Sequence, residues 1–553
     1  MIKYTYIFII FFCFNCFGQS KQDYIKNPTT TYRNELPINI RAQWQHLDIE
    51  KDTLAGTSLN RAYKEIIKNK KGKEIIVAVI DTDIDINHED LKPAIWINKK
   101  EIPHNGIDDD KNGYTDDVNG WNFLGNAKGE SISYANITPI RILRNLKKKY
   151  SHYPNFEGNI KDSLLYVKTK NQFKKDLEDL NELKKYASQN LKSYRESFKK
   201  VEAQLHKNNF EIDEIDNLYR KCKKENASLT QEVLTLRNFI RLGKDYTELI
   251  NDSIKVQDKF RTSYNEDYHD RAIIGDNDLD LKDTHYGNNN VSKNAKWTYH
   301  GTIVSGVIGA NRKNKIGIEG FSDQIKIMPI LAVPYGGYEH EKDINLAIHY
   351  AVDNGAKVIN MSFGNTSGDH TDWIKEAFLY AQEHDVLLIA GAGNDSSDND
   401  IKPFYPIDYD EQTGVEFCDN FIKVGAITLD GDKYFLAHFT NYGKKTVDLF
   451  APGYFLKTTD PIVGYSYRDG TSMAGPIVTG VAALIRSHYP KLTAKQVKNI
   501  ILESGVAYKL DVVVPGEKNG LLKPFTELSK SGKVVNAYNA LLLAEEISTG
   551  KKN

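Results

Sequence analysis

Three short segments of this chain contain the residue types of a hydrolytic triad. Asp81 follows the apolar run IIVAVI, His300 lies in YHGTIVSGVIGA, and Ser472 lies in DGTSMAGPIVTGVAALI. A carboxylate, an imidazole and a hydroxyl can together move a proton and generate a nucleophile for acyl transfer. Each residue type is common by itself. The prediction therefore depends on the flanking sequences and on the order acid, base, nucleophile along the chain.

The sequence around Ser472 predicts a nucleophile at the start of a helix. Gly470 and Thr471 precede it, and an apolar helical pattern continues to Ile485. Unpaired backbone N–H groups and the helix dipole at such a position favour the negative charge of an oxyanion. Glycines on either side let a substrate backbone come close. A plain helix cap is the alternative interpretation, and it would be the commoner one for Gly-Thr-Ser alone.

Three further predictions complete this chemistry. His300 opens a predicted helix of small and apolar residues, and an imidazole accepts a proton near neutral pH. Asp81, at the end of a predicted strand, would hold the imidazole in one tautomer and stabilise the imidazolium. Asn394 ends the sequence GAGN after another buried strand, and its side-chain amide would donate to the oxyanion.

The order of predicted elements indicates the fold class. Strands are predicted at 325–333, 357–361 and 386–390, with helices at 344–354 and 372–384. This alternation predicts an α/β fold, a mostly parallel sheet flanked by helices. Function in such folds gathers at the carboxyl ends of the strands, which is where Asp81 and Asn394 fall.

The segment 129–265 has a different character. It is rich in charged residues and leucine, and it is nearly free of glycine and proline after Gly158. Apolar residues recur at spacings of three and four from Phe173 to Leu205, and a second set from Ile215 to Leu236 would pack back against the first. We expect an inserted helical hairpin or coiled coil. It is either a self-contained helical pair, the simpler interpretation, or an arm that docks a partner.

An acidic loop at residues 105–117, NGIDDDKNGYTDD, predicts a structural Ca²⁺ site. Ca²⁺ takes six to eight oxygen ligands, and alternating acidic residues around a turn glycine supply them. The loop lacks the terminal glutamate of an EF-hand, and a plain solvated turn is the alternative. The expected ligands are Asp108, Asp110, Asn112, Asp116 and Asp117. A weaker cation candidate is the group Asp276, Asp278, Asp280 and Asp283.

The N-terminus predicts export. Lys3 precedes an apolar stretch of about 14 residues, and the polar sequence GQSK follows. This stretch is shorter than the roughly 20 residues that span a bilayer, and it has the layout of a secretory signal. Periplasm, cell surface and medium all fit. Cys13 and Cys16 lie in the stretch, but the residues before them, Phe12 and Asn15, are not small, so a lipid anchor is the less favoured alternative.

Composition narrows the class of protein. The chain has 553 residues, 40% of them apolar and 27% charged, and a net charge of −1, which gives no reason to expect nucleic acid as a partner. Outside the signal no apolar run approaches membrane length, and only Cys222 and Cys418 remain, which leaves one disulfide open but makes no disulfide scaffold. The expected organisation is a signal peptide at 1–19, an N-terminal arm at 20–54, a catalytic domain at 55–128 and 266–545, and the helical insertion at 129–265.

Six segments resemble the subtilase family, the subtilisin-like serine proteases. DTDIDINHEDL, HGTIVSGVIGA, NMSFG, AGAGN, NYGKKTVDLFAPG and GTSMAGP occur in the family's order, and the resemblance covers 55–128 and 266–545. It implies a triad of Asp81, His300 and Ser472, with Asn394 completing the oxyanion hole. It also implies a protein or peptide substrate that pairs as an added strand. The implied substrate-channel residues are Ser362, Phe363, Gly364, Gly391, Ala392 and Gly393.

Two departures from the family pattern leave questions open. Asp83 stands where the family usually has glycine, so a second carboxylate either disturbs the local turn or raises the basicity of His300. Asp81 and His300 are separated by 219 positions, far more than in compact members. The insertion between them lies either near one end of the active-site cleft, restricting substrates or docking a partner, or on the rear of the domain.

Our leading hypothesis is a secreted serine endopeptidase that forms an acyl-enzyme on Ser472. A catalytically silent protein that binds a partner through the insertion is the first alternative, motivated by Asp83 and by the length of 129–265. A peptidase dedicated to one substrate is the second. Residues 20–54 are too few for the folded inhibitory prodomain of many subtilases, so the sequence leaves activation and side-chain preference open.

Overall fold

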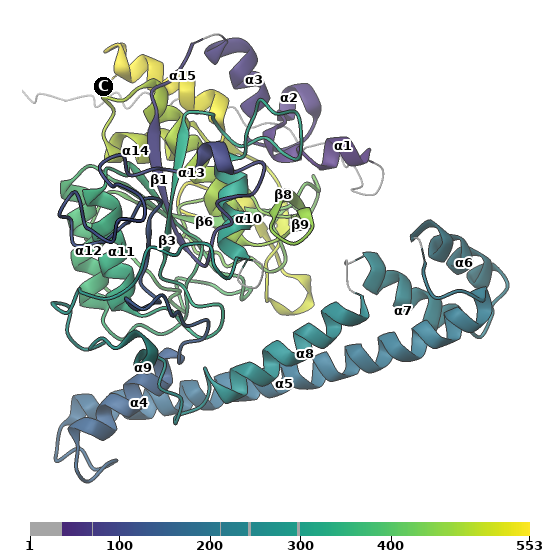
Figure 1. Ribbon diagram of the computed structural model, residues 1–553. Coiled ribbons are helices and arrows are strands. Elements are labelled where there is room, and N and C mark those ends of the chain that lie inside the picture. The colour runs from purple at the N-terminus through teal and green to yellow at the C-terminus, as the bar shows by residue number, and fades with distance from the viewer. Residues whose placement is uncertain (1–35, 69, 211, 242–244, 296–298, 553) are drawn as a thin grey trace, which may run out of the picture.

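The computed structural model describes residues 36–68, 70–210, 212–241, 245–295 and 299–552. The predicted signal, residues 1–19, lies outside them. Figure 1 shows two parts, a body built around a twisted sheet and a long helical arm that extends along one end of it. Both parts bear on the site, because the arm is inserted between the segments that carry Asp81 and His300.

The body contains a nine-stranded sheet in the order β10-β13-β7-β6-β5-β4-β1-β3-β2. Neighbouring strands pair in parallel except β10 and β13. The predicted fold class is therefore confirmed. The strands are β1 (Ile75–Asp81), β2 (Trp121–Asn122), β3 (Ile325–Leu331), β4 (Val358–Met361), β5 (Leu387–Gly391), β6 (Phe421–Ile427), β7 (Leu449–Pro452), β10 (Val506–Ala507) and β13 (Lys533–Val534).

Both faces of the sheet are buried, which explains the continuous apolar run of β1. Successive side chains of a strand point to opposite faces. Val77 and Val79 accordingly join the core under one helical layer, whereas Ala78 and Ile80 join the core under the other. The first layer contains α10 (His300–Gly309), α13 (Thr471–His488), α14 (Ala494–Ser504) and α15 (Ala537–Ser548), and the second contains α11 (Glu341–Asp353) and α12 (Thr371–Glu383).

The chain before β1 also belongs to this body. Trp44 is fully buried and donates from Nε1 to the Tyr454 carbonyl at 3.1 Å, and Leu54 lies in the same core. Residues 44–49 and Leu54, expected in an N-terminal arm, thus pack against the body, and residues 50–53 are exposed. The remaining elements here are α1 (Ile38–Arg41), α2 (Ile49–Asp52), α3 (Leu59–Ala62) and the antiparallel pairs β8 (Leu456–Asp460) with β9 (Gly464–Arg468) and β11 (Asp511–Val513) with β12 (Leu522–Pro524).

The arm is the predicted helical insertion. Its 46-residue helix α5 (Ile160–Leu205) is about 70 Å long at 1.5 Å per residue. Tyr194 and Val201 on α5 pack against Ile215 and Leu236, so the predicted back-packing is confirmed. None of the helices in the described ranges is both long and apolar enough to cross a membrane. The other helices here are α4 (Thr138–Lys149), α6 (Ile212–Lys224), α7 (Thr230–Arg241), α8 (Tyr246–Arg261) and α9 (Arg271–Ile274).

The two cysteines outside the predicted signal lie in different hydrophobic cores. Cys222 belongs to the core of the arm and Cys418 to the core around α11 and α12. Both are buried free thiols. The single disulfide that the sequence left open is therefore absent from this structure.

Candidate active site

The expected catalytic residues meet at one edge of the sheet. Strands β5, β4 and β1 are neighbours, and their carboxyl ends lead into Asn394, Ser362 and Asp81. Parallel strands end on the same side, so these three residues lie at a common edge. Helices α10 and α13 pack against each other; His300 is the first residue of α10, and Ser472 is the second residue of α13.

Asp81 and His300 form a hydrogen-bonded pair. Nδ1 of His300 lies 2.8 Å from Oδ1 of Asp81, which also accepts the Thr82 amide at 2.7 Å. The carboxylate is fully buried, whereas the His300 side chain is 36% exposed. Burial lowers the pKa of His300, but the charge and hydrogen bond of Asp81 outweigh it, and the pKa is raised overall. The pair therefore offers a strengthened base with its other nitrogen, Nε2, available to a substrate or nucleophile.

Gly301 and Thr302 explain how α10 reaches the end of β1. A methyl group on Gly301 would lie 2.4 Å from the Thr82 carbonyl oxygen, so a side chain there would push the helix away. The Gly301 amide donates to Thr82 Oγ1 at 3.0 Å, and Thr302 Oγ1 accepts the Asp85 amide at 2.9 Å. The dipeptide after the histidine thus fixes the distance between imidazole and carboxylate.

Asp83 has a structural contact of its own. Its carboxylate is 5% exposed and accepts the Asn294 amide at 3.0 Å. The charges that act on the pKa of His300 are those of Asp81 and Arg468. The second carboxylate after β1 therefore stabilises the loop that leads toward α10, a role that the sequence alone did not indicate.

Ser472 sits half-buried beside the end of β4. Its hydroxyl donates to the Ser362 carbonyl at 3.1 Å, and the Ser362 hydroxyl donates to the Ser472 carbonyl at 3.2 Å. Within the described part of the chain, Ser472 makes no hydrogen bond to His300. A change of the Ser472 χ1 rotamer would redirect the hydroxyl, and such bonds commonly tighten only when substrate is bound.

Asn394 is oriented by its neighbours as a donor. Its Oδ1 accepts both the Thr471 amide at 2.8 Å and the Thr471 hydroxyl at 3.1 Å. With the oxygen occupied, Nδ2 is the group left for a ligand. A methyl group built on Gly470 would lie 3.7 Å from Asn394 Nδ2 and 3.6 Å from the Ser472 amide nitrogen. Two N–H donors thus flank one small space in front of Ser472.

The predicted substrate channel holds an aromatic ring. Gly364 and Gly393, after β4 and β5, have φ of +157° and +107°, and Gly393 in particular needs the freedom of glycine. A methyl group on Gly364 would lie 2.5 Å from Cε1 of Phe404, and one on Gly393 would lie 3.0 Å from Cδ2 of the same ring. Phe404 therefore fills the crevice between the two strand ends. Sequence analysis missed it, because a loop phenylalanine carries no motif.

The other predicted channel residues divide between the crevice and a neighbouring cavity. Ser362, Gly391 and Ala392 are buried at the strand ends. Phe363 is half-buried and lines a cavity of about 310 Å³ together with Glu339 and other residues. Burial raises the pKa of Glu339 to about 6. Phe363, the neighbour of Ser362, thus links the predicted channel to this cavity.

The acidic loop brings together three carboxylates that could hold a cation. Single oxygens of Glu101, Asp108 and Asp110 lie within 4.8 Å of one another. Glu101 is 6% exposed; its Oε1 accepts the Asp109 and Asp110 amides, while its Oε2 is buried without a hydrogen-bond partner among the described residues. An unsatisfied buried carboxylate oxygen is costly unless a cation faces it. The donor set therefore fits Ca²⁺. Glu101 precedes the motif and escaped sequence analysis.

The other expected ligands have protein partners. Asp116 accepts the amides of Asn105 and Gly106, which closes the loop. Asn112 donates from Nδ2 to Asp117, and Asp117 also accepts from Asn98 and Tyr350. Burial raises the pKa of Asp117 to about 6 despite these bonds. Asn112, Asp116 and Asp117 thus stabilise the fold of the loop.

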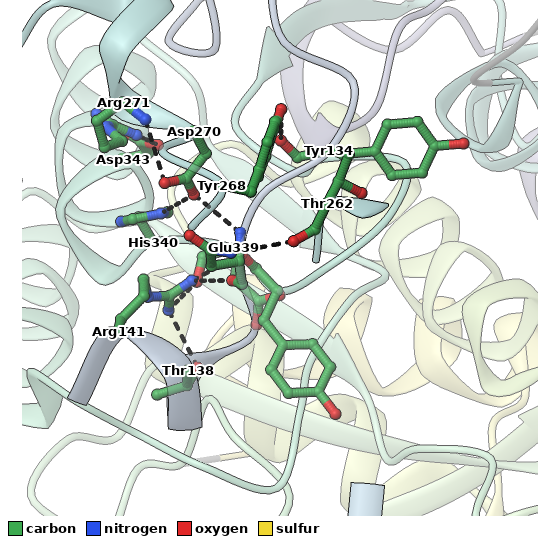
Figure 2. Close-up of polar contacts among 12 residues, drawn as sticks. Tyr134, Thr138, Arg141, Thr262, Tyr268, Asp270, Arg271, Glu339, His340 and Asp343 are labelled. Carbon is green, nitrogen blue, oxygen red and sulfur yellow. Dashed lines mark hydrogen bonds and ion pairs between the residues drawn. The ribbon is translucent and has the colours of Figure 1, made fainter. Parts of the chain in front are cut away.

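Polar contacts fix the base of the arm to the body (Figure 2). Arg141 of α4 is 3% exposed and donates to the carbonyls of Asn136 and Glu339 at 2.8 and 2.9 Å. Asp270, at the end of the insertion, accepts the Asn136 amide at 2.9 Å and lies 3.0 Å from His340 Nε2. Both ends of the arm are thus tied to the segment that follows β3. In the weaker cation candidate, Asp276 is bound to Arg271 and Lys342, and Asp283 lies 3.7 Å from Lys342.

Comparison with known proteins identifies the family. The family model described as "Subtilase family" matches residues 72–520. The chain belongs to the subtilase family. This confirms the expected membership, and the helices α5 to α8 show where this subtilase carries its insertion.

Relatives of this subtilase include characterised bacterial proteins. It is 39% identical over 189 residues to "Thermophilic serine proteinase" of Bacillus sp. (strain AK1). This match covers 34% of this chain and 42% of the relative. It is 34% identical over 209 residues to "Subtilisin DY" of Bacillus licheniformis, covering 38% and 70%. It is 34% identical over 226 residues to "Fervidolysin" of Fervidobacterium pennivorans, a match that covers 36% of this chain and 30% of the relative. The matched region thus spans less than half of the first and the third of these relatives.

Proposed function

We propose that this subtilase is a serine endopeptidase that cleaves peptide bonds of proteins through an acyl-enzyme on Ser472. Ser472 Oγ attacks the scissile carbonyl carbon while His300 Nε2 takes the hydroxyl proton. The carbonyl oxygen becomes an oxyanion between Asn394 Nδ2 and the Ser472 amide. The C–N bond then breaks, and the leaving amine takes the proton from His300. Water attacks the acyl group by the reverse sequence and restores the serine.

One observation carries this proposal above the others. The buried Asp81 carboxylate lies 2.8 Å from the imidazole of His300, whose pKa is raised, at the sheet edge where a helix presents Ser472. A base with a buried acid partner beside a hydroxyl at a helix start is the arrangement that nucleophilic catalysis requires. The other oxygen of this carboxylate, Asp81 Oδ2, is buried without a hydrogen bond in the described part.

A fluorophosphonate probe tests the proposal directly. Wild-type protein should be labelled, and Ser472→Ala should not. Absence of wild-type labelling would overturn the enzyme hypothesis and favour a silent protein that binds a partner through its arm. Labelling together with cleavage of casein supports a general endopeptidase. Labelling with little cleavage of casein would instead support a peptidase dedicated to one substrate.

We further propose that the residue before the scissile bond has a small side chain. An acyl group on Ser472 with its oxygen at Asn394 places that side chain toward the crevice between β4 and β5. Phe404 already occupies the crevice, in contact with the backbone of Gly364 and Gly393. Glycine, alanine or serine would fit over the ring without displacing it, whereas leucine or phenylalanine would require the ring to move.

We also propose a structural calcium ion held by Glu101, Asp108 and Asp110, with further oxygens from the loop and water. The ion would neutralise carboxylates whose mutual repulsion otherwise destabilises the loop. Its role would be stability rather than chemistry, because the loop is not among the segments that contact Ser472 or His300.

Export and domain organisation complete the proposal. The layout of residues 1–19 favours cleavage of a secretory signal, with periplasm, cell surface or medium as the destination. A catalytic domain interrupted by the insertion at 129–265 accounts for the length of the chain. Fractionation of the native host, with N-terminal sequencing of the mature protein, tests both. A retained Met1 in a cell-internal fraction would refute export.

A further inference from the structure

A cavity of about 400 Å³ lies between the arm and the body. Helices α5 and α8 supply Leu183, Tyr186, Lys255 and Lys259, and the segment after β3 supplies Tyr335. Tyr186 is 62% exposed and Leu183 42% exposed, although each faces this shared space. The cavity exists only because the insertion is present, since two of its walls are helices of the arm.

The cavity holds two ammonium groups without carboxylate partners. Across the described ranges of the chain, no ion pair or hydrogen bond joins Lys255 or Lys259 to a carboxylate, and the ammonium of Lys255 instead contacts two tyrosine rings. Burial lowers the pKa of Lys259, and the charge of Lys255 lowers it further. Of the charged side chains that line the cavity, two are lysines and one is Asp252, while Glu248 and Asp258 lie behind the lining residues Tyr335 and Tyr134. Two half-buried cations that lack a carboxylate partner favour an anionic ligand.

This cavity adjoins the catalytic histidine. The Lys255 ammonium lies 5.8 Å from the ring centre of Tyr299 and 5.5 Å from that of Tyr335. Tyr299 immediately precedes His300, and the Arg468 guanidinium lies 5.1 Å from the same Tyr299 ring. Two cations therefore contact the ring next to His300: Lys255 from the cavity, and Arg468, which is itself paired with Asp460 at 2.7 Å. A substrate seated on Ser472 would reach the cavity with a side chain a few residues from the scissile bond, since an extended chain advances about 3.3 Å per residue.

We propose that the arm builds a subsite for an acidic side chain of the substrate. The inference rests on the proposed endopeptidase function and adds a substrate class to it: proteins with an aspartate or glutamate near the cleaved bond. The carboxylate would sit between Lys255 and Lys259, and its aliphatic stem would contact the aromatic wall formed by Tyr186 and Tyr335. Partly desolvated charge pairs discriminate more strongly than exposed ones.

Matched peptides test the subsite. A set of fluorogenic peptides carries glutamate at one position from five residues before to five residues after the scissile bond, and each has a glutamine twin. For full-length wild-type enzyme we expect one position at which the glutamate peptide has a kcat/KM at least about tenfold higher, equivalent to about 1.4 kcal/mol. The preference should shrink between 0.05 and 0.5 M salt, values chosen to span roughly a threefold change in screening length.

Variants assign that preference to the cavity. Lys255→Gln with Lys259→Gln should bring the glutamate-to-glutamine ratio close to one, and arginine at both positions should restore it. Both peptides are measured with the same variant, so a smaller folded fraction lowers both rates equally and leaves their ratio unchanged. Lys199→Gln, at an exposed position of α5, is the matched control and should keep the wild-type ratio.

The outcomes separate the two hypotheses. A wild-type ratio near one at every position overturns the subsite while cleavage itself upholds the peptidase. A preference that survives in the double glutamine variant also overturns it, because another site must then bind the acid. If wild-type enzyme cleaves no peptide and takes no fluorophosphonate label, the peptidase proposal fails and the subsite fails with it.

Discussion

Replacing Phe404 by alanine should convert a small-residue protease into one that accepts large side chains. The ring lies between Gly364 and Gly393, so its removal opens the crevice that receives the residue before the scissile bond. Burying a leucine or phenylalanine side chain there stabilises the transition state by about 1.5–3 kcal/mol. That corresponds to about 10- to 150-fold in kcat/KM for the large residue relative to alanine.

The cost of the substitution is moderate. Truncation of a fully buried phenylalanine to alanine lowers the free energy of unfolding by about 3–5 kcal/mol. Phe404 is only half-buried, so we expect roughly half of that loss. Lys423 Nζ lies 5.4 Å from the centre of the Phe404 ring, a contact that the substitution removes, but it also donates to the carbonyls of Phe404 and Pro406, so the backbone of the loop stays attached. Phe198→Ala in the arm removes a similarly half-buried ring far from the crevice, and serves as the control for stability.

The assay compares tetrapeptide p-nitroanilides that end in alanine, leucine or phenylalanine. Wild-type enzyme and Phe198→Ala should both prefer alanine, and Phe404→Ala should reverse the order. The reasoning fails if the wild type already cleaves the phenylalanine substrate as fast as the alanine one. It fails equally if the Phe404→Ala variant is folded and active but keeps the wild-type ratio.

Three further predictions concern the catalytic residues and the acidic loop. Asn394→Ala should lower kcat by about 10²–10³ with little change in KM, and a loss below threefold would remove this side chain from the oxyanion hole. Because His300 must be unprotonated to act and its pKa is raised, kcat/KM should fall as the pH is lowered through a value above the ordinary pKa of about 6.5. Asp81→Asn should shift that inflection to lower pH, and an unmoved inflection would assign it to another group. Removing calcium with EDTA should lower the melting temperature by several degrees, since an ion at 100 times its Kd stabilises by about 2.7 kcal/mol. Glu101→Gln should abolish this calcium response and the exposed Glu225→Gln should not; an equal response in both would exclude Glu101 as a ligand.

Local sequence predicted much of the body. The strand before Asp81 is apolar on both faces because helices cover both sides of a parallel sheet. That continuous apolar run can be recognised from the local sequence alone. A helix of small and apolar residues was predicted after His300, and the structure supplies the reason for Gly301, since a methyl group there would lie 2.4 Å from the Thr82 carbonyl oxygen. The heptad-like seam of the arm was equally legible, because a helix buries one stripe of its own sequence.

Other residues could not be found this way. Glu101 lies outside the acidic motif and joins it only when the loop folds back to place it beside Asp108. Phe404 reaches the crevice from a loop more than ten residues beyond Gly393, and nothing in its flanks marks that contact. Asp83 suggested a disturbed turn or a more basic histidine, but its carboxylate accepts the amide of Asn294, more than 200 residues away.

The chain by itself thus determined the chemistry available, the sheet and the helical nature of the insertion, because each of these is written in residues close together. Where the arm lies, which side chains share the crevice, and which cations stand beside His300 were decided by tertiary packing alone. The physical reason is that periodicity and capping act over a few residues, whereas a site is assembled from contacts between segments whose separation along the chain carries no information about their distance in space.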